Sequence, residues 1–211
     1  LEEVSFIAVN SNPISNIFNK ALYGLKNIKN YKFFFNRLIL KHKKTSFKKL
    51  LTEKFNIKKI PLVKYYDHHL CHISSAYYPS KQQKSLLISA DGFGDFASTV
   101  AAVGINDTVS IKNKILFPHS LGIFYQAFTQ FLGFKNYGDE YKVMGLSAYG
   151  LDKFKKELDE VLQINDGSFN LNLKFFQHHQ KNISMQWNDE SPKFANLYSE
   201  NLNKLLKFDS E

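Results

Sequence analysis

The middle of the chain reads SLLISADGFGD at residues 85–95, and this stretch decides the fold. A short apolar run bounded by turn residues predicts a buried strand, and the glycines after it predict a strand-to-turn junction. Residues 98–103 and 108–111 continue as strands around a turn at 104–107, and residues 120–132 place apolar side chains on one helical face. Because strands and helices alternate, the sequence predicts an α/β fold.

Two more strands are expected upstream of this stretch. Residues 4–10 form an apolar run that ends in a turn-rich cluster, as a buried strand of a parallel sheet does. Residues 60–66 predict a second short strand. Asp67 then stands where a helix N-cap belongs, and residues 68–76 continue as a helix that Pro79 stops.

Beyond Gly150 the chain changes character. Residues 152–164 predict a short amphipathic helix, and residues 165–190 are polar and irregular with a turn at Asp166-Gly167. Ser191-Pro192 is expected to open a last helix that runs to about Lys207.

The net charge of +9 is concentrated in one segment. Residues 20–59 hold thirteen Lys or Arg and a single acid, Glu53, so the rest of the chain is slightly acidic. Phenylalanines lie between these cations, a composition that could grip phosphates while aromatic rings stack on bases. The alternative is a pair of amphipathic helices with solvated lysines, and we favour it because apolar residues fall at spacings that suit a packed helical face; nucleic acid is not expected as a partner.

The bulk composition indicates a globular protein without a membrane anchor. Apolar residues make up 44% of the 211, yet no run approaches the roughly 20 that a membrane-spanning helix needs. The single cysteine excludes an internal disulfide framework. We expect a soluble, cytoplasmic protein, and because the chain starts at Leu1 we expect a piece of a longer one.

Three histidines give the strongest local signal for chemistry. In a helix, His68 and His72 are four residues apart and project from one face, so that two imidazoles can reach one metal ion. His69 is three residues from His72, which is also a workable spacing. The alternative is a histidine cluster, buried or on the surface, that binds no metal, and the residues alone leave both interpretations open.

Two glycine-bearing segments are further candidates. At residues 91–94, backbone N–H groups of a glycine turn could accept a phosphate, while Asp91 could hold a metal-bound water or orient a nucleotide; a plain hairpin turn is the alternative. Residues 132–150 hold four glycines and the charged residues Asp139, Glu140 and Lys142. They describe either a functional loop with one or two helical turns or an ordinary connection between subdomains.

Four segments together resemble the N-terminal catalytic domain of the nodulation-type and antibiotic-type carbamoyltransferases. They are DHHLCHISSAYY at 67–78, DGFG at 91–94, PHSLGIFY at 118–125 and GDEYKVMGLSAYG at 138–150. Four linked motifs in one order are far more specific than any one of them. Residues 20–59 and 151–211 match that family only in general character.

The resemblance implies an actin-like, ribonuclease-H-like ATPase core that is incomplete in this chain. Residues 1–80 would be the remainder of a first actin-like subdomain, with a basic helical insertion at 14–59. Residues 81–211 would start the second subdomain, with a helical and irregular segment at 151–211. The implied reaction uses ATP and carbamoyl phosphate to make a carbamoyl-adenylate, and then passes the carbamoyl group to a hydroxyl of a sugar, natural product or similar small molecule.

Site residues carry over by motif. The resemblance implies a divalent metal, with iron expected and zinc as the alternative, held by His68 and His72. The nucleotide would be bound by Asp91, Gly92, Gly94 and Gly145, and catalytic roles would fall to His69, Asp91 and Lys142. Bound cations of this kind polarise a carbonyl or lower the pKa of a hydroxyl.

The chain departs from the family pattern at both ends. The phosphate-binding hairpin of the family would precede Leu1, whereas an acidic third metal ligand and the C-terminal domain that handles carbamoyl phosphate are expected beyond Glu211. We therefore expect no turnover from this chain alone. Two rivals stay open: a relative of the enzymes that make threonylcarbamoyladenosine in tRNA, and a non-catalytic actin-like nucleotide-binding domain.

Overall fold

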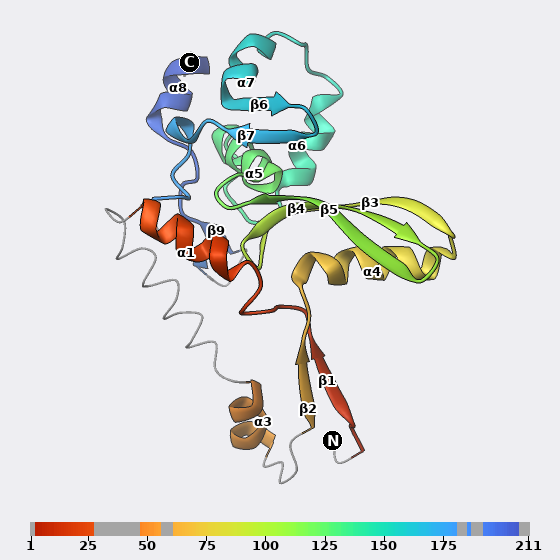
Figure 1. The fold of residues 1–211 in the computed structure, drawn as a ribbon. Coiled ribbons are helices and arrows are strands. Elements are labelled where there is room, and N and C mark those ends of the chain that lie inside the picture. Colours follow the sequence, from red (N-terminus) through yellow and green to blue (C-terminus); the bar gives the residue numbers. More distant parts are fainter. Residues whose placement is uncertain (1–2, 28–46, 56–60, 181–184, 187–191, 207–211) are drawn as a thin grey trace. The chain divides into compact units, whose positions relative to one another are not determined.

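The computed structural model describes residues 3–27, 47–55, 61–180, 185–186 and 192–206 of the chain. It is a mixed α/β structure with small sheets, as the strand and helix pattern predicts (Figure 1). The chain divides into two compact units. The first comprises residues 1–89 and 94–114, and the second residues 90–93 and 115–211.

The first unit begins with a parallel pair of strands. Strand β1 (Phe6–Val9) pairs with β2 (Leu62–Tyr65) in a register that sets Phe6 opposite Leu62. Both predicted strands are therefore confirmed, and so is their parallel direction. The burial expected of the first strand is wrong, because Phe6 is 49% exposed.

The basic segment contributes two helices to the described residues. These are α1 (Ile17–Lys26) and α3 (Phe47–Phe55). The apolar residues Phe18, Leu22 and Leu25 of α1 share one helical face and are exposed, so that among the described residues no layer covers them. The predicted helical character is confirmed where it can be followed, and residues 28–46 and 56–60 lie outside the described part of the chain.

Helix α4 (His68–Ser80) carries the histidine motif. Asp67 caps it as predicted, since its Oδ1 accepts a hydrogen bond from the Leu70 N–H at 3.2 Å. The predicted stop before Pro79 is wrong: the helix runs through this proline to Ser80. Pro79 lies in the last turn, where its missing N–H removes only one intrahelical bond.

Strands β3 (Lys84–Gly94), β4 (Ala97–Ile105) and β5 (Thr108–Leu116) form a three-stranded sheet in that order (Figure 1). The turn predicted at residues 91–94 is wrong, because these residues extend β3. The chain reverses instead at Asp95 and Phe96, whose φ angles of 51° and 78° suit the twist of a two-residue hairpin. On β3, which lies at the edge of the sheet, Leu86 and Ile88 are 72% and 67% exposed.

One face of α4 fixes the helix on the sheet. His69, Ile73 and Tyr77 follow one another at helical spacing and are all buried. Gly104 of β4 makes room for this contact, since an added Cβ would stand only 2.5 Å from the Tyr77 ring. The face of α4 that carries His68 and His72 is therefore held in a fixed orientation by packing that does not involve them.

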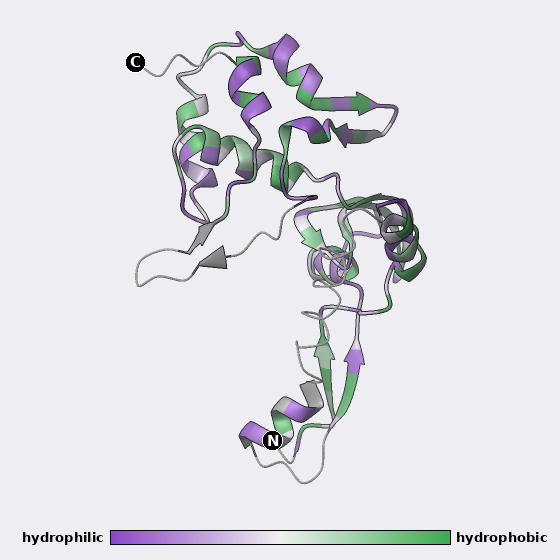
Figure 2. Ribbon diagram, turned by 90° about the vertical axis from the view of Figure 1, so that its left-hand side faces the viewer, coloured by the Kyte–Doolittle hydropathy of each residue, from purple (hydrophilic) through white to green (hydrophobic). Residues whose placement is uncertain are grey.

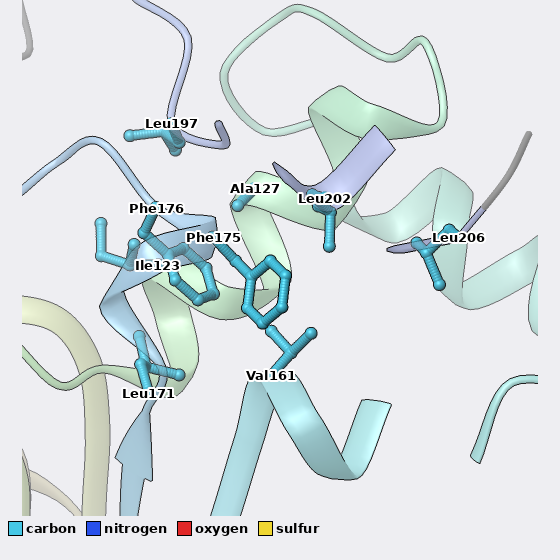
Figure 3. Close-up of a cluster of buried hydrophobic side chains, with 9 residues drawn as sticks. All are labelled: Ile123, Ala127, Val161, Leu171, Phe175, Phe176, Leu197, Leu202 and Leu206. Atoms are coloured by element: carbon cyan, nitrogen blue, oxygen red, sulfur yellow. The ribbon is translucent and has the colours of Figure 1, made fainter. Parts of the chain in front are cut away.

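The second unit is built on the predicted helix α5 (Leu121–Phe131). Ser120 caps it by accepting a hydrogen bond from the Ile123 N–H at 3.1 Å. Figure 3 shows the core of this unit, in which two side chains of α5 meet side chains from the later part of the chain. Its members are Ile123, Ala127, Val161, Leu171, Phe175, Phe176, Leu197, Leu202 and Leu206.

Later elements of this unit are shorter than predicted. Helix α6 (Glu140–Ser147) confirms the helical turns expected in the 138–150 motif, and α7 (Lys155–Val161) ends before the expected boundary at 164. Strands β6 (Leu162–Asn165) and β7 (Ser168–Leu171) form a hairpin at the predicted Asp166-Gly167 turn, and hydrophobic and hydrophilic residues alternate along them (Figure 2).

The end of the described chain differs from the prediction. A 3-10 turn at Leu173–Phe175 is followed by a two-stranded pair, β8 (Met185–Gln186) with β9 (Lys193–Phe194). The last helix, α8 (Glu200–Leu206), begins well after the expected start at Ser191-Pro192. No helix among the described elements has both the length and the apolar character to cross a bilayer.

A half-buried imidazole, that of His119, should make the second unit sensitive to acid. The Nδ1 atom of His119 accepts the Leu171 N–H at 3.0 Å, and burial lowers the pKa of His119 below its ordinary 6.5. The unfolded chain takes up this proton near pH 6.5 and the folded chain only at lower pH. The contribution to the free energy of unfolding is therefore complete above pH 6.5 and lost as the pH falls toward the folded pKa.

Urea unfolding of the full-length protein between pH 7.5 and 5.5 tests this. We expect stability to fall on acidification, and His119→Asn to flatten the slope, because an amide oxygen can still accept the Leu171 N–H but does not titrate in this range. A variant slope that parallels the wild-type slope would show that other groups, such as His179, whose pKa burial also lowers, govern the acid response.

Candidate metal centre

The imidazole rings of the two histidines predicted as metal ligands lie side by side on α4. His68 and His72 stand four residues apart on the helix, and their Nε2 atoms lie 2.9 Å apart. The ring centroids are 4.6 Å apart and the rings are nearly perpendicular. The predicted convergence of the two imidazoles is therefore present in the structure.

A carboxylate joins this pair. One ligand atom each from His68, His72 and Asp91 lies within 4.8 Å of the others, so that the three could hold a metal ion. Asp91 follows Ser89 by two residues on β3, and alternate residues of a strand share a face. Ser89 contacts His69 of α4, so alternation along β3 sets Asp91 on the strand face that carries this contact. A third ligand was expected only beyond Glu211, and Asp91 supplies a candidate within the chain.

The donor set fits a first-row divalent cation. Two imidazole nitrogens and one carboxylate are the ligands that Fe(II) and Zn(II) commonly take, and two histidines with one carboxylate leave further coordination positions open. Two nitrogens bound at right angles, each about 2.1 Å from an ion, would stand about 3.0 Å apart. The observed 2.9 Å separation agrees with this value. The arrangement does not identify the metal.

His68 is oriented by its surroundings. Its Nδ1 lies 3.2 Å from the carbonyl oxygen of Asn10, which can only accept, so Nδ1 carries the proton and Nε2 keeps its lone pair. Gly94 lies against the other side of the ring. An added Cβ there would be 1.9 Å from Cδ2 and 2.8 Å from Cβ of His68. Only glycine leaves room for this ring position.

Helix α5 approaches the backbone at Asp91. The Ser120 hydroxyl lies 2.8 Å from the Gly92 carbonyl and 3.0 Å from the Asp91 carbonyl. Gly122 permits this approach, because a Cβ there would stand 2.8 Å from the Gly92 nitrogen. The Asp91 carboxylate itself accepts the Gly92 N–H at 2.6 Å. Within the second unit, to which residues 90–93 belong, a buried serine and a glycine thus hold the backbone that presents Asp91.

His69 lies on the buried face of α4, and its ring nitrogens contact the sheet. It is fully buried, with Nε2 at 3.1 Å from the Ala97 carbonyl and Nδ1 at 2.8 Å from the Ser89 hydroxyl. A carbonyl oxygen only accepts, so Nε2 donates and Nδ1 accepts from Ser89. These contacts hold α4 on the sheet, and the catalytic role expected of His69 stays a prediction.

Lys142 and Gly145 lie on α6. The Lys142 Nζ is 2.7 Å from Asp139 Oδ1, and this hydrogen bond raises the pKa of Lys142 and lowers that of Asp139. An added Cβ at Gly145 would meet no atom within 4 Å, and the same holds at Gly92. Because its pKa is raised, Lys142 keeps its positive charge. The roles of Lys142, Gly92, Gly94 and Gly145 toward a nucleotide stay predictions.

The sequence pointed to Asp91 but not to its place beside the histidines. Residues 91–94 were expected to form a turn that could bind a phosphate, whereas they form the end of β3. The available signal was the alternation along β3, which sets Asp91 on the same face as Ser89. Ser120 and Asp95, whose contacts hold the same region, gave no signal in the sequence beyond their positions in motifs.

A family model described as the carbamoyltransferase N-terminus matches residues 19–205. The chain belongs to this family. Among its relatives, this carbamoyltransferase N-terminal domain is 36% identical over 159 residues to an uncharacterized protein of Synechocystis, covering 74% of the chain and 25% of that protein. The family confirms the resemblance seen in the four motifs.

Two nodulation proteins are similar over shorter stretches. Nodulation protein NolNO of Sinorhizobium fredii is 40% identical over 104 residues, which are 48% of this chain and 15% of that protein. Nodulation protein NolO of Bradyrhizobium diazoefficiens is 39% identical over 111 residues, which are 51% of this chain and 20% of that protein. The chain thus spans no more than a quarter of the length of these relatives.

Proposed function

We propose that the full-length protein is an ATP-dependent O-carbamoyltransferase that moves a carbamoyl group from carbamoyl phosphate to a hydroxyl of a small molecule, such as a sugar or natural product. The observation that carries this proposal is the cluster of His68, His72 and Asp91 in a carbamoyltransferase N-terminal domain. Adenylation requires a carboxylate oxygen as nucleophile. Carbamoyl phosphate would therefore first be hydrolysed by water to carbamate and phosphate. Carbamate would then displace pyrophosphate from ATP, and the acceptor hydroxyl would displace AMP.

The chain's own residues have distinct parts in this scheme. His68, His72 and Asp91 would hold a divalent cation, with iron expected and zinc as the alternative. When bound, such a cation supplies Lewis acidity toward the carbamoyl carbonyl or the acceptor hydroxyl. Asp91, Gly92, Gly94 and Gly145 would face the nucleotide, and the open space beside Gly92 and Gly145 supports this. Lys142 would offer positive charge to a phosphate, and His69 would support the ligand helix.

The proposal extends to the architecture. Residues 1–80, with the basic insertion at 14–59, would complete one actin-like subdomain, and residues 81–211 would begin the second. Since the relatives are at least about four times longer than the region that they share with this chain, a C-terminal domain that handles carbamoyl phosphate is the expected partner within the same polypeptide. We propose a cytoplasmic location, where ATP and carbamoyl phosphate are available.

An assay that needs no acceptor tests the function. Full-length protein should catalyse exchange of labelled pyrophosphate into ATP only when carbamoyl phosphate is present. Removal of the metal by a chelator should lower this exchange at least about 100-fold, because loss of even an outer partner of a metal ligand costs about 10- to 100-fold. Re-addition of Fe(II) or Zn(II) should restore it. Exchange that is absent from the metal-loaded protein would refute the assignment. Exchange that is unchanged in the chelated protein would exclude a role of the cation in adenylation and leave its role toward the acceptor hydroxyl.

A further inference from the structure

The carboxylate of Asp95 is a junction of three backbone segments in the first unit. It lies in the turn between β3 and β4 with a φ of 51°. Its Oδ1 accepts the Ser11 hydroxyl at 2.8 Å, and its Oδ2 accepts the Asn12 N–H at 2.7 Å and the His68 N–H at 3.0 Å. One side chain therefore ties the loop after β1 and the first residue of α4 to the hairpin.

The segments joined in this way are those that orient His68. The loop after β1 supplies the Asn10 carbonyl that receives the His68 Nδ1–H, one residue before Ser11. The hairpin supplies Gly94, which borders the His68 ring one residue before Asp95. A further hydrogen bond, from the Asn16 side chain to the Asp95 carbonyl at 2.9 Å, fastens the same loop to the same turn.

We propose that Asp95 is a positioning residue for the metal centre: it sets the ring and the tautomer of His68 without itself being a ligand. The inference rests on the proposed metal site. The described residues that could together hold an ion are His68, His72 and Asp91, and Asp95 is not among them. Its two oxygens are occupied by donors from the loop and from α4. Without this carboxylate, the loop that carries the Asn10 carbonyl is no longer hydrogen-bonded through Asp95 to the start of α4, which carries the His68 ring.

Cobalt(II) titration of the full-length, metal-free protein tests the inference, with affinity and visible absorption as readouts. Asp95→Gly removes the carboxylate and accepts the positive φ without strain. We expect about 10- to 100-fold weaker cobalt binding and an altered ligand-field spectrum, the size typical of outer partners of metal ligands. Asp95→Asn should restore affinity, because its amide oxygen can accept from Asn12 and His68 while its NH₂ faces the Ser11 hydroxyl.

Asn106→Gly is the matched control. Asn106 also has a φ of 51°, in the other turn of the same sheet, and its backbone N–H and carbonyl bond Gln83 and Tyr77. Cobalt binding by this variant should equal that of the wild type. If Asp95→Gly does not fold, Ser11→Ala removes one of the three donors and should still weaken binding, by less than is expected of Asp95→Gly.

Three outcomes would each contradict a different part of the inference. Cobalt binding lost in His68→Ala but unchanged in Asp95→Gly and in Ser11→Ala would overturn the positioning role and leave the metal centre intact. A wild-type protein that binds no cobalt would overturn the metal centre and, with it, this inference. An effect of Asp95→Gly that Asp95→Asn fails to reverse would show that the hydrogen bonds to the carboxylate position are not its cause.

Discussion

Full-length protein in which His68 or His72 is replaced by alanine should lose its bound metal and its carbamoyl-phosphate-dependent exchange. Each change removes one of only two imidazoles in the cluster, and the two remaining groups cannot enclose an ion as three do. We expect at least about 100-fold weaker metal binding, a greater loss than outer partners cause. Metal content by mass spectrometry and pyrophosphate exchange would measure the two effects.

Cys71→Ser provides the control on the same helix. Cys71 lies between the two histidines in sequence but is not part of the cluster, and it is only half-buried. This variant should keep the wild-type metal content. Wild-type metal and exchange in His68→Ala and His72→Ala would place the ion, or the chemistry, elsewhere in the polypeptide.

Gly94→Ala should have a comparable effect without altering any ligand. The new methyl group would coincide with the His68 ring, and because the conflict reaches Cβ of His68, ring rotation alone cannot relieve it. The ring must leave its place or α4 must shift away from the hairpin. We expect metal affinity to fall about 100-fold, at the upper end of the range for residues that orient metal ligands.

Gly92→Ala separates this effect from a general loss of strand structure. Gly92 lies two residues earlier on β3, where an added Cβ meets no atom within 4 Å. The metal affinity of Gly92→Ala should therefore stay close to wild type, even if nucleotide binding changes. Equal losses of metal affinity in both variants would mean that β3 tolerates no side chain in this region, and the specific conflict with His68 would be excluded as the cause.

The sequence was informative where periodicity and chemistry coincide. The spacing of His68 and His72 predicted a converging pair, and Asp67 stands directly before α4 as a helix cap does. Apolar runs located β1, β2 and the start of β3. Each of these inferences depends on contacts within a few residues, which local pattern describes well.

Inferences that depend on distant contacts failed. Glycines at 92 and 94 suggested a turn, but Phe93 between them packs on Phe117 and His178 of the second unit, and the strand continues. Gly94 permits the close approach of the His68 ring instead of a chain reversal, and this ring belongs to a residue 26 positions earlier in the chain. The role of Asp95 was hidden for the same reason, since its partners come from residues 11, 12 and 68.

Strand β3 has a consequence for work with this chain in isolation. Its outer border pairs with no other strand in the described part of the chain, and Leu86 and Ile88 beside it are exposed. An unpaired strand edge can form hydrogen bonds with the same edge of another molecule unless another segment covers it. Preparations of this chain by itself are therefore prone to aggregate through β3.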